Sequence, residues 1–540
     1  MQGLMMNYPL TLQHAFTRAT TIFSRNTIVT QTEGEPHCYT YKEWGERVMQ
    51  LANALRQAGV QQGDRVATFG WNTYRHFELY YAVPCMGAVL HTLNIRLFVD
   101  QLLYIINEAE DKFIFVDGDL VPLLEKLAPQ LPSVQLYVIM GEAPYGTGAL
   151  QPAVDYEAFL AGQPAVYEWP QLEEDTAAAM CYTSGTTGNP KGVVYSHRSI
   201  FLHSLGVCLA DGMGLCEQDV ALPVVPMFHA NAWGIPHAAA FTGTSLVFPG
   251  RFLDPARLAR LMESQHVTIS AGVPTIWIGL LHLLEREQYD LSALRAIYCG
   301  GSAAPRSLIE GLARKGINLL HAWGMTETSP LASMARPRRL QAEQSLDELF
   351  RVKATQGTIS ACVDFRVVDM ETGQQVPWDG RSYGELQVRG PWVARAYYKD
   401  TGFAARFADG WLRTGDVAVV DENGMLQLVD RTKDLVKSGG EWISSVELEG
   451  LIMGHPKVLE ACVIGVPHPK WGERPLACVV PKPEYADQIT TEELFEHLRP
   501  KVAKWALPDA IIFVEAIPKT SVGKFDKKVL RQRFETYPLD

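Results

Sequence analysis

The sequence predicts an α/β protein with a large N-terminal domain and a small α+β domain at its C-terminal end. Three observations lead to this class. Short apolar runs alternate with longer helical patterns through most of the 540 residues, which is typical of a mostly parallel sheet covered by helices. After about residue 353 the runs look antiparallel, and after about Asp430 a new helix–strand rhythm begins.

The parallel sheet is predicted from buried runs that each end in a turn signal. Such runs begin at Asp64, Lys112, Val134 and Thr244, with the sequences DRVATFGWN, KFIFVDG, VQLYVIMG and TSLVFPG. Between the first two, YYAVPCMGAVLHTLN predicts a helix that leads to a further strand. We therefore expect layered α/β subdomains in this part of the chain.

The pattern changes in the second half of the chain. Residues 336–353 are charged and weakly periodic, which indicates a surface helix or a crossing segment. Further on, Asn423 and Gly424 lie between two alternating runs and predict a β-hairpin. We place the domain boundary at Asp430, so that residues 1–430 and 431–540 form the two domains.

Composition and charge exclude several classes of protein. The formal net charge is −12, and because an acidic chain repels a phosphate backbone, we expect no nucleic-acid partner. The nine cysteines include no C-x-x-C pair, which fits reduced thiols in the cytoplasm better than disulfides or a zinc site. We see neither a secretory signal nor an apolar run long enough for a transmembrane segment.

The stretch CYTSGTTGNPKGVVYSH, which starts at Cys181, combines glycines, hydroxyl side chains and one lysine between two apolar runs. A Walker A loop needs Gly before its Lys and Ser or Thr after it, whereas Lys191 lies between Pro190 and Gly192. Backbone N–H groups, hydroxyls and a lysine can still hold a polyphosphate. The residues expected to do so are Thr183, Ser184, Gly185, Thr186, Thr187, Gly188 and Lys191.

This loop and a series of later motifs resemble the signatures of the adenylate-forming superfamily, which includes acyl-CoA synthetases, adenylation domains of peptide synthetases and beetle luciferases. The resemblance implies that the large domain contains a distorted β-barrel and that the small domain is mobile. The later motifs are, in order, PMFHANAW from Pro226, YCGGSAAP from Tyr298, HAWGMTETSP from His321, WLRTGDVA from Trp411, DRTKDLVKSGGEWIS from Asp430 and PKTSVGKFDK from Pro518.

The resemblance also implies a reaction. ATP and a carboxylic acid form an acyl-AMP with release of pyrophosphate, and coenzyme A then takes the acyl group and releases AMP. Magnesium offsets the triphosphate charge, with Glu327 and Thr183 as its ligands. Lys524 bridges the substrate carboxylate and the α-phosphate, where charge develops during adenylation.

Further residues receive roles through the same resemblance. Lys433 is at the hinge of the mobile domain, and Asp416 accepts hydrogen bonds from the ribose. Ser438, Gly439, Gly440 and Glu441 line the entry tunnel of coenzyme A, where glycine allows a narrow chain to pass close to the backbone. The remaining residues expected to contact ATP or acyl-AMP are Gly300, Gly301, His321, Ala322, Trp323, Gly324, Thr326, Arg431, Lys437 and Trp442.

The acyl group is expected near His229, Ala230 and Trp233. An amino-acid substrate needs a carboxylate here, and the sequence has none in residues 226–250. The order FHANAW is similar to that of bacterial fatty-acyl-CoA synthetases, in which the Trp gates an acyl tunnel. The acid is therefore expected to be a medium- or long-chain fatty acid.

The sequence does not fix the length of the acyl chain of the substrate. Ala230 replaces the Val of several relatives and His237 replaces their Tyr, and these changes widen or polarise a pocket. Ligases of short acids such as methylthiopropionate share nearly the same motifs, so a short acid or an aryl acid is the alternative. An amino-acid adenylation module and a luciferase-like oxygenase are less favoured. The resemblance further implies a homodimer formed through the large domain. Separately, we expect transient membrane contact.

Overall fold

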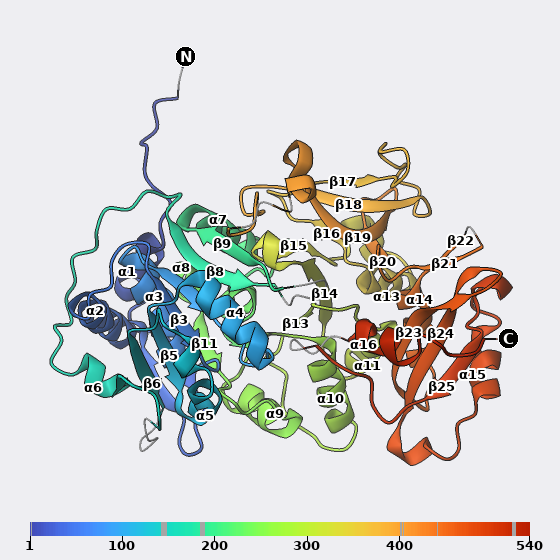
Figure 1. Cartoon of the computed structure of the whole chain (residues 1–540), viewed down its shortest axis with the longest axis horizontal. Coiled ribbons are helices and arrows are strands. Elements are labelled where there is room, and N and C mark those ends of the chain that lie inside the picture. The colour runs from blue at the N-terminus through green and yellow to red at the C-terminus, as the bar shows by residue number, and fades with distance from the viewer. Residues whose placement is uncertain are drawn as a thin grey trace.

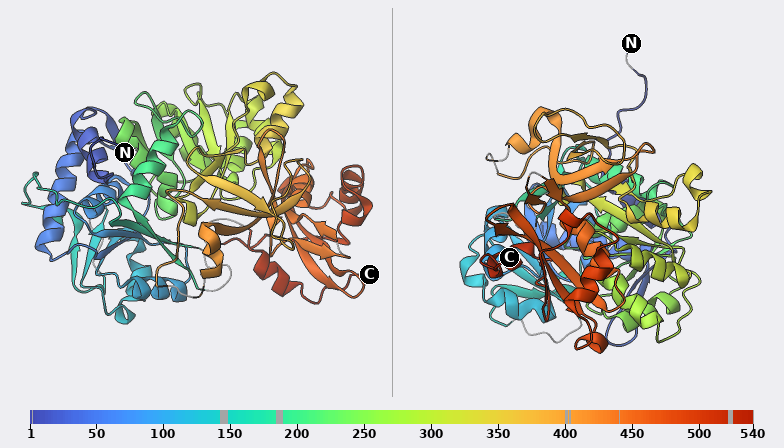
Figure 2. Two further views of the ribbon diagram at one scale, coloured as in Figure 1. Left: turned by 90° about the horizontal axis from the view of Figure 1, so that it is seen from above. Right: turned by 90° about the vertical axis from the view of Figure 1, so that its right-hand side faces the viewer.

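The computed structural model consists of a large N-terminal body and a smaller C-terminal lobe. The lobe lies at one end of the body, as Figure 1 and the left-hand view of Figure 2 both show. None of the described helices is long and apolar enough to cross a membrane. The structure describes residues 1, 3–141, 148–183, 189–399, 402, 404–439, 441–520 and 525–539.

The body contains two large sheets, and the first has seven strands. All its neighbouring strands run parallel except the last pair, β8 and β9. In spatial order the strands are β7 (Ala153–Asp155), β6 (Leu136–Met140), β5 (Phe113–Asp117), β3 (Arg65–Phe69), β4 (Val89–Thr92), β8 (Ala177–Tyr182) and β9 (Gly192–Ser196).

The second large sheet has nine strands, with a parallel centre and antiparallel edges. Its order is β16 (Thr358–Ile359), β15 (Leu331–Met334), β14 (Leu319–Gly324), β13 (Ala296–Cys299), β12 (Ile269–Gly272), β10 (Val220–Pro223), β11 (Ser245–Phe248), β1 (Thr27–Thr30) and β2 (His37–Thr40).

Both sheets are buried on two faces, and alternate side chains of one strand enter different cores. In β5, Phe113 and Phe115 belong to the central core, whereas Ile114 and Val116 belong to an outer one. The helices of the central core are α1 (Leu12–Thr21), α2 (Tyr41–Gln57), α3 (Tyr74–Cys85), α6 (Tyr156–Leu160), α7 (His197–Cys208) and α8 (Ile235–Thr242). The outer cores contain α4 (Val99–Ala109) and α5 (Val121–Glu125) on one side and α9 (Pro255–Ser264), α10 (Pro274–Leu284) and α11 (Arg306–Arg314) on the other.

An antiparallel sheet of four strands completes the body: β17 (Asp364–Val368), β18 (Tyr383–Arg389), β19 (Leu412–Val420) and β20 (Leu426–Arg431). A bridge between Gly357 and Leu426 joins it to the end of β16. The predicted hairpin connects β19 and β20, and Gly424 has a φ of 74°. The carboxylate of Asp421 accepts hydrogen bonds from the N–H groups of Asn423 and Met425 and so fixes the turn.

The C-terminal lobe has a sheet of five strands: β21 (Val436–Ser438), β22 (Glu441–Ile443), β23 (Val458–His468), β24 (Gly472–Pro481) and β25 (Ala510–Phe513). Its helices are α14 (Ser445–Met453), α15 (Thr491–Leu498) and α16 (Lys527–Arg533). Alternate residues of β23 enter two apolar clusters, one on each face of the sheet. The lobe therefore has cores of its own.

These findings confirm the predicted fold class. The predicted parallel strands are β3, β5, β6 and β11, and the charged segment 336–353 contains α12 (Arg339–Ala342) and α13 (Leu346–Ala354). All nine cysteines are free. The boundary at Asp430 stays a prediction; the structure has β20 end at Arg431 and β21 begin at Val436.

Asp117 is a buried carboxyl group at the end of β5. It accepts a hydrogen bond from the N–H of Trp71 at 2.7 Å, and burial, with the nearby charge of Asp119, raises its pKa to about 7. Because this pKa is higher in the folded than in the unfolded chain, the group favours folding below about pH 4, and this contribution is lost as the pH rises to about 7.

We therefore expect Asp117→Asn to flatten the pH dependence of stability between pH 5 and pH 8. The amide oxygen of the variant still accepts the hydrogen bond from Trp71. Because the amide carries no charge, the variant does not pay the cost of burying a carboxylate at high pH, which is at most about 4 kcal/mol in the wild type. Urea denaturation at both pH values measures this. Asp211→Asn, at an exposed position, serves as control. A variant whose stability falls between the two pH values as steeply as that of the wild type would contradict the assignment.

Candidate active site

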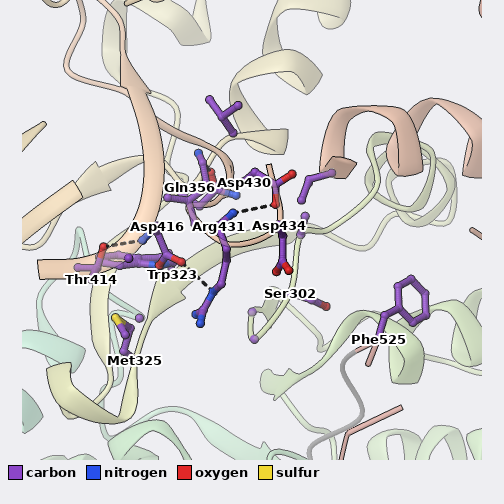
Figure 3. A pocket seen from close by; sticks show the side chains of 18 of the residues that line it. Ser302, Trp323, Met325, Gln356, Thr414, Asp416, Asp430, Arg431, Asp434 and Phe525 are labelled. Atoms are coloured by element: carbon purple, nitrogen blue, oxygen red, sulfur yellow. Dashed lines mark hydrogen bonds and ion pairs between the residues drawn. The ribbon is translucent and has the colours of Figure 1, made fainter. Parts of the chain in front are cut away.

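One large cavity, of about 1120 Å³, lies between the body and the C-terminal lobe. Segments far apart in the sequence line it: the end of the glycine-rich stretch, the FHANAW segment, the ends of β13 and β14, the hinge region and α16. Figure 3 shows part of this lining, with Trp323, Arg431 and Phe525 around the same space. Of the predicted site residues, the cavity brings together Thr183, Lys191, His229, Ala230, Trp233, Gly300, Gly301, His321, Ala322, Trp323, Gly324, Thr326, Glu327, Asp416, Arg431 and Lys433.

The glycine-rich stretch closes on itself at its base. The N–H of Thr183 donates to the carbonyl of Lys191 at 2.9 Å, and the N–H of Lys191 donates to the Thr183 hydroxyl at 3.1 Å. These two bonds hold the ends of the loop together at the edge of the cavity. The predicted phosphate-binding residues Ser184, Gly185, Thr186, Thr187 and Gly188 lie outside the described residues.

Glu327 is almost fully buried in the wall of the cavity. The phenol of Tyr397 donates a hydrogen bond to its carboxylate at 2.5 Å, and the guanidinium of Arg406 lies 3.7 Å from the same oxygen. The neighbouring Thr326 is fixed through its carbonyl, which accepts from the Tyr195 hydroxyl at 2.7 Å. The carboxylate is therefore held in one orientation before any ligand binds.

Asp416 is a second buried carboxylate, and three elements meet at it (Figure 3). The indole N–H of Trp323, on β14, donates to it at 3.0 Å, and the guanidinium of Arg431, on β20, forms an ion pair with it at 2.9 Å. Asp416 itself is on β19. This geometry fixes an acceptor that lines the cavity, which suits the recognition of hydroxyl groups.

Glycines in the floor of the cavity allow a ligand to lie close to the backbone. A Cβ on Gly300 would lie 2.9 Å from the carbonyl oxygen of Ala322 and 3.1 Å from the ring of Trp233, so only glycine fits there. Gly301 has a φ of 82°, which favours glycine as well. His321 is buried beside them, and burial lowers its pKa, so that the imidazole is neutral at pH 7. A flat, uncharged ligand such as a purine ring suits this floor.

The acyl end contains an unusual backbone conformation. Ala230, Asn231, Ala232 and Trp233 all have positive φ values, between 43° and 56°. A run of non-glycine residues in this left-handed region is strained, and such strain is typical of functional sites. Trp233 ends the run, and its ring packs against Gly300.

His237 lies on α8 and is not among the described residues that line the cavity. Its ring stacks on Tyr80 with a centroid distance of 5.1 Å. Burial, with the nearby charges of other histidines, lowers its pKa to about 3, so the imidazole is neutral. The substitution noted at this position thus changes the layer packed around α8 and not the surface of the cavity.

The C-terminal lobe is anchored at the hinge by a buried polar cluster. The Asp430 carboxylate accepts from the N–H and hydroxyl of Ser445, at 2.7 and 2.5 Å. Lys527, on α16, donates to the same hydroxyl and forms an ion pair with Glu449 at 2.8 Å. Burial opposes the charge on Lys527, but Glu449 and Asp430 outweigh it and raise the lysine pKa. Lys524 lies outside the described residues, and its described neighbours Phe525, Asp526 and Lys527 line the cavity.

Other predicted residues of the lobe lie away from the cavity lining. Lys437 and Trp442 face each other across β21 and β22, with the ammonium 4.4 Å from the ring centroid. The Ser438 hydroxyl accepts from Arg474 at 2.8 Å, and Gly439 packs under Trp471 with a φ of 61°. Gly440 and the side chain of Glu441 lie outside what the structure describes.

Some residues of the site were not predicted from the sequence. Tyr397, Arg406, Gln356, Glu449 and Lys527 line the cavity or contact a lining residue. Four of them belong to none of the quoted motifs. Lys527 ends the motif PKTSVGKFDK, in which only Lys524 was assigned a role from the sequence. Their partners lie far away along the chain, so local spacing carried no signal.

Comparison with known proteins identifies the family of the chain. Residues 16–398 match the model of the AMP-binding enzyme family, and residues 447–524 match that of the AMP-binding enzyme C-terminal domain. The chain is 48% identical to a long-chain-fatty-acid–CoA ligase of Thermus thermophilus over 99% of this chain and 97% of that protein. It is 42% identical to a medium-chain-fatty-acid–CoA ligase of Ectopseudomonas oleovorans (95% and 93%), and 43% identical to a 3-methylmercaptopropionyl-CoA ligase of Ruegeria pomeroyi (99% of each).

Solved structures have the same fold over the whole chain. An anthranilate CoA ligase in complex with anthranoyl-AMP matches with a TM-score of 0.86 at 26% identity, covering 98% of both chains. ATP-bound MatB from Rhodopseudomonas palustris matches with a TM-score of 0.83 at 27% identity, covering 98% of this chain and 99% of MatB. The chain belongs to the AMP-binding enzymes of the adenylate-forming superfamily, and within it to the AMP-forming acyl-CoA ligases.

The hinge cluster leads to a prediction about the lobe. Asp430→Ala leaves the N–H and the hydroxyl of Ser445 without their acceptor, which costs about 1–3 kcal/mol for a buried group. We expect trypsin to cleave the segment that contains Arg431, Lys433 and Lys437 about tenfold faster, because cleavage follows local opening. Asp379→Ala, in an exposed turn of the body, is the matched control. Equal cleavage of both variants would show that the cluster does not hold the lobe.

Proposed function

We propose that this AMP-forming ligase activates medium- to long-chain fatty acids and transfers them to coenzyme A. The observation that carries the proposal is the chemistry of the acyl end of the cavity. Ala230, Trp233, Ile278 and Leu331 line the cavity there, and residues 226–250 contain no carboxylate that could pair with a substrate ammonium. An apolar acyl chain is the group that such a surface binds.

The relatives support the same substrate class, since two of them are named for long- and medium-chain fatty acids. A second candidate is a short acid, because the 3-methylmercaptopropionyl-CoA ligase is as similar to the chain as the medium-chain enzyme. Both candidates use the same two half-reactions and differ only at the acyl end. An aryl acid is a further variant, named in the structural relative that holds anthranoyl-AMP.

The described residues suit the first half-reaction. Lys191 lies at the loop that we assign to the triphosphate, and Asp416, which we assign to the ribose hydroxyls, lines the same cavity. Glu327 and Thr183 present a carboxylate and a hydroxyl to the same cavity, and these are oxygen donors of the kind that Mg²⁺ prefers together with substrate phosphates. When bound, Mg²⁺ offsets the charge of the triphosphate.

Lys524 has the charge-stabilising role at the junction of carboxylate and α-phosphate in this proposal. It follows the described Thr520 and precedes Phe525, both of which line the cavity. The second half-reaction then needs a rotation of the lobe about Lys433, which brings Ser438 and Gly439 to the acyl-AMP. Lys437 and Trp442 are assigned to the nucleotide in one of the two orientations.

We also assign the protein to the cytoplasm as a homodimer formed through the body. The N-terminal arm supports this assembly, because Leu4, Met5 and Met6 are about nine-tenths exposed and the arm runs away from the body (Figure 1). Uncovered apolar side chains of this kind suit a protein interface.

CoA-dependent release of AMP, measured with straight-chain acids from three to eighteen carbons, tests which acid is the substrate. We expect the largest kcat/KM among medium and long chains, because each buried CH₂ adds about 0.8 kcal/mol of binding until the site is full. 3-Methylthiopropionate and benzoate are measured alongside. A sharp optimum at short acids, or with either of these two, would replace the fatty-acid assignment.

Lys524→Ala separates the two half-reactions. We expect acyl-AMP formation to fall by at least a hundredfold, because the charge at the transferring phosphorus loses its partner. Thioester formation from supplied acyl-AMP should stay near the wild-type rate. Lys519→Ala removes a lysine of the same segment that pairs with Glu460 at the surface and serves as control. An equal loss in both half-reactions would rule out a role confined to adenylation.

A further inference from the structure

The segment between β18 and residue 399 is irregular, yet it is tightly anchored. The indole of Trp392 donates to the carbonyl of Leu331 at 3.1 Å, and the N–H of Ala394 donates to the carbonyl of Glu327 at 2.7 Å. At the far end, the N–H of Tyr398 donates to the carbonyl of Gly192 at 2.8 Å. The segment is thus fixed to the Glu327 turn on one side and to the base of the glycine-rich stretch on the other.

Tyr397 lies between these anchors and contacts a charged group from each side. Its phenol donates to the Glu327 carboxylate at 2.5 Å, and the ammonium of Lys191 lies 5.2 Å from the centroid of its ring. The tyrosine is only 5% exposed. One side chain therefore joins the carboxylate assigned to magnesium and the lysine assigned to the triphosphate.

Arg406 completes this arrangement. Its guanidinium lies 5.9 Å from the Tyr397 ring centroid and 3.7 Å from the Glu327 carboxylate. It is itself held by the carbonyls of Arg413 and Thr414, at 3.1 and 3.2 Å. Two cations thus lie within 6 Å of the Tyr397 ring centroid, which favours a fixed ring.

We propose that Tyr397 is a positioning residue for adenylation, which orients Glu327 through its hydroxyl and Lys191 through its ring. The inference rests on the function proposed above and adds a residue to it. Partners that orient a ligating carboxylate typically contribute 10- to 100-fold to metal affinity or activity. The two contacts fix Glu327 and Lys191 relative to each other before ATP enters the cavity.

Two substitutions separate the hydroxyl from the ring. Tyr397→Phe keeps the ring for Lys191 and removes the donor to Glu327, whereas Tyr397→Leu removes both contacts. Calorimetric titration of ATP into the full-length protein, without acid or coenzyme A, measures binding directly at low and at high Mg²⁺. We expect Tyr397→Phe to bind ATP about tenfold more weakly at low Mg²⁺ and close to normally at high Mg²⁺. Tyr397→Leu should bind more weakly at both concentrations.

Tyr398→Phe is the matched control, because it removes a phenol from the next residue, whose side chain packs on Gly192 and not on Glu327. Thioester formation from supplied acyl-AMP should be unchanged in Tyr397→Phe, which also shows that the variant is folded. If Tyr397→Phe bound ATP like Tyr398→Phe, or lost both half-reactions equally, the positioning role would be wrong. A wild-type protein without acid-dependent AMP release would instead overturn the proposed function.

Discussion

The ion pair between Arg431 and Asp416 is the interaction on which the rest of the site depends. It ties the end of β20 to β19, and Trp323 brings β14 of the nine-stranded sheet to the same carboxylate. Three strands from two different sheets therefore meet at one buried carboxylate. Asp430 directly precedes Arg431 and accepts a hydrogen bond from Ser445 of the C-terminal lobe. The ion pair therefore also helps to fix the position of the lobe. The ion pair of Asp416 and the hinge are thus adjacent in space, because Arg431 directly follows Asp430.

The contacts across this hinge differ in kind from those inside each part. Both apolar clusters of the lobe consist only of residues from Val436 onward, and none of the described members comes from the body. The hinge itself is held by Asp430, Ser445, Lys527 and Glu449, which form hydrogen bonds and an ion pair. A rotation of the lobe therefore exchanges polar contacts and leaves the apolar cores intact. This is the energetic condition for the lobe rotation that the proposed second half-reaction needs.

Much of this architecture could be predicted from the sequence. Strands such as β5 are buried on both faces, so their apolar runs are visible without any periodicity, and the Asn423–Gly424 hairpin has a local signal. The candidate site was visible because its residues lie in contiguous motifs. What could not be predicted depends on contacts between distant segments, as between Tyr397 and Glu327 or between Lys527 and Glu449. The left-handed run that ends at Trp233 gave no signal either, because its residues are not glycines. The place of Lys437 and Trp442 depends on the orientation of the whole lobe, which no local pattern encodes.

Isotope exchange shows whether the acid is activated in this cavity before coenzyme A takes part. The protein is incubated with ATP, Mg²⁺, a fatty acid and labelled pyrophosphate, without coenzyme A. We expect label to enter ATP only when the acid is present, because a reversible acyl-AMP forms in the cavity. Exchange that requires coenzyme A, or formation of ADP in place of AMP, would contradict this mechanism.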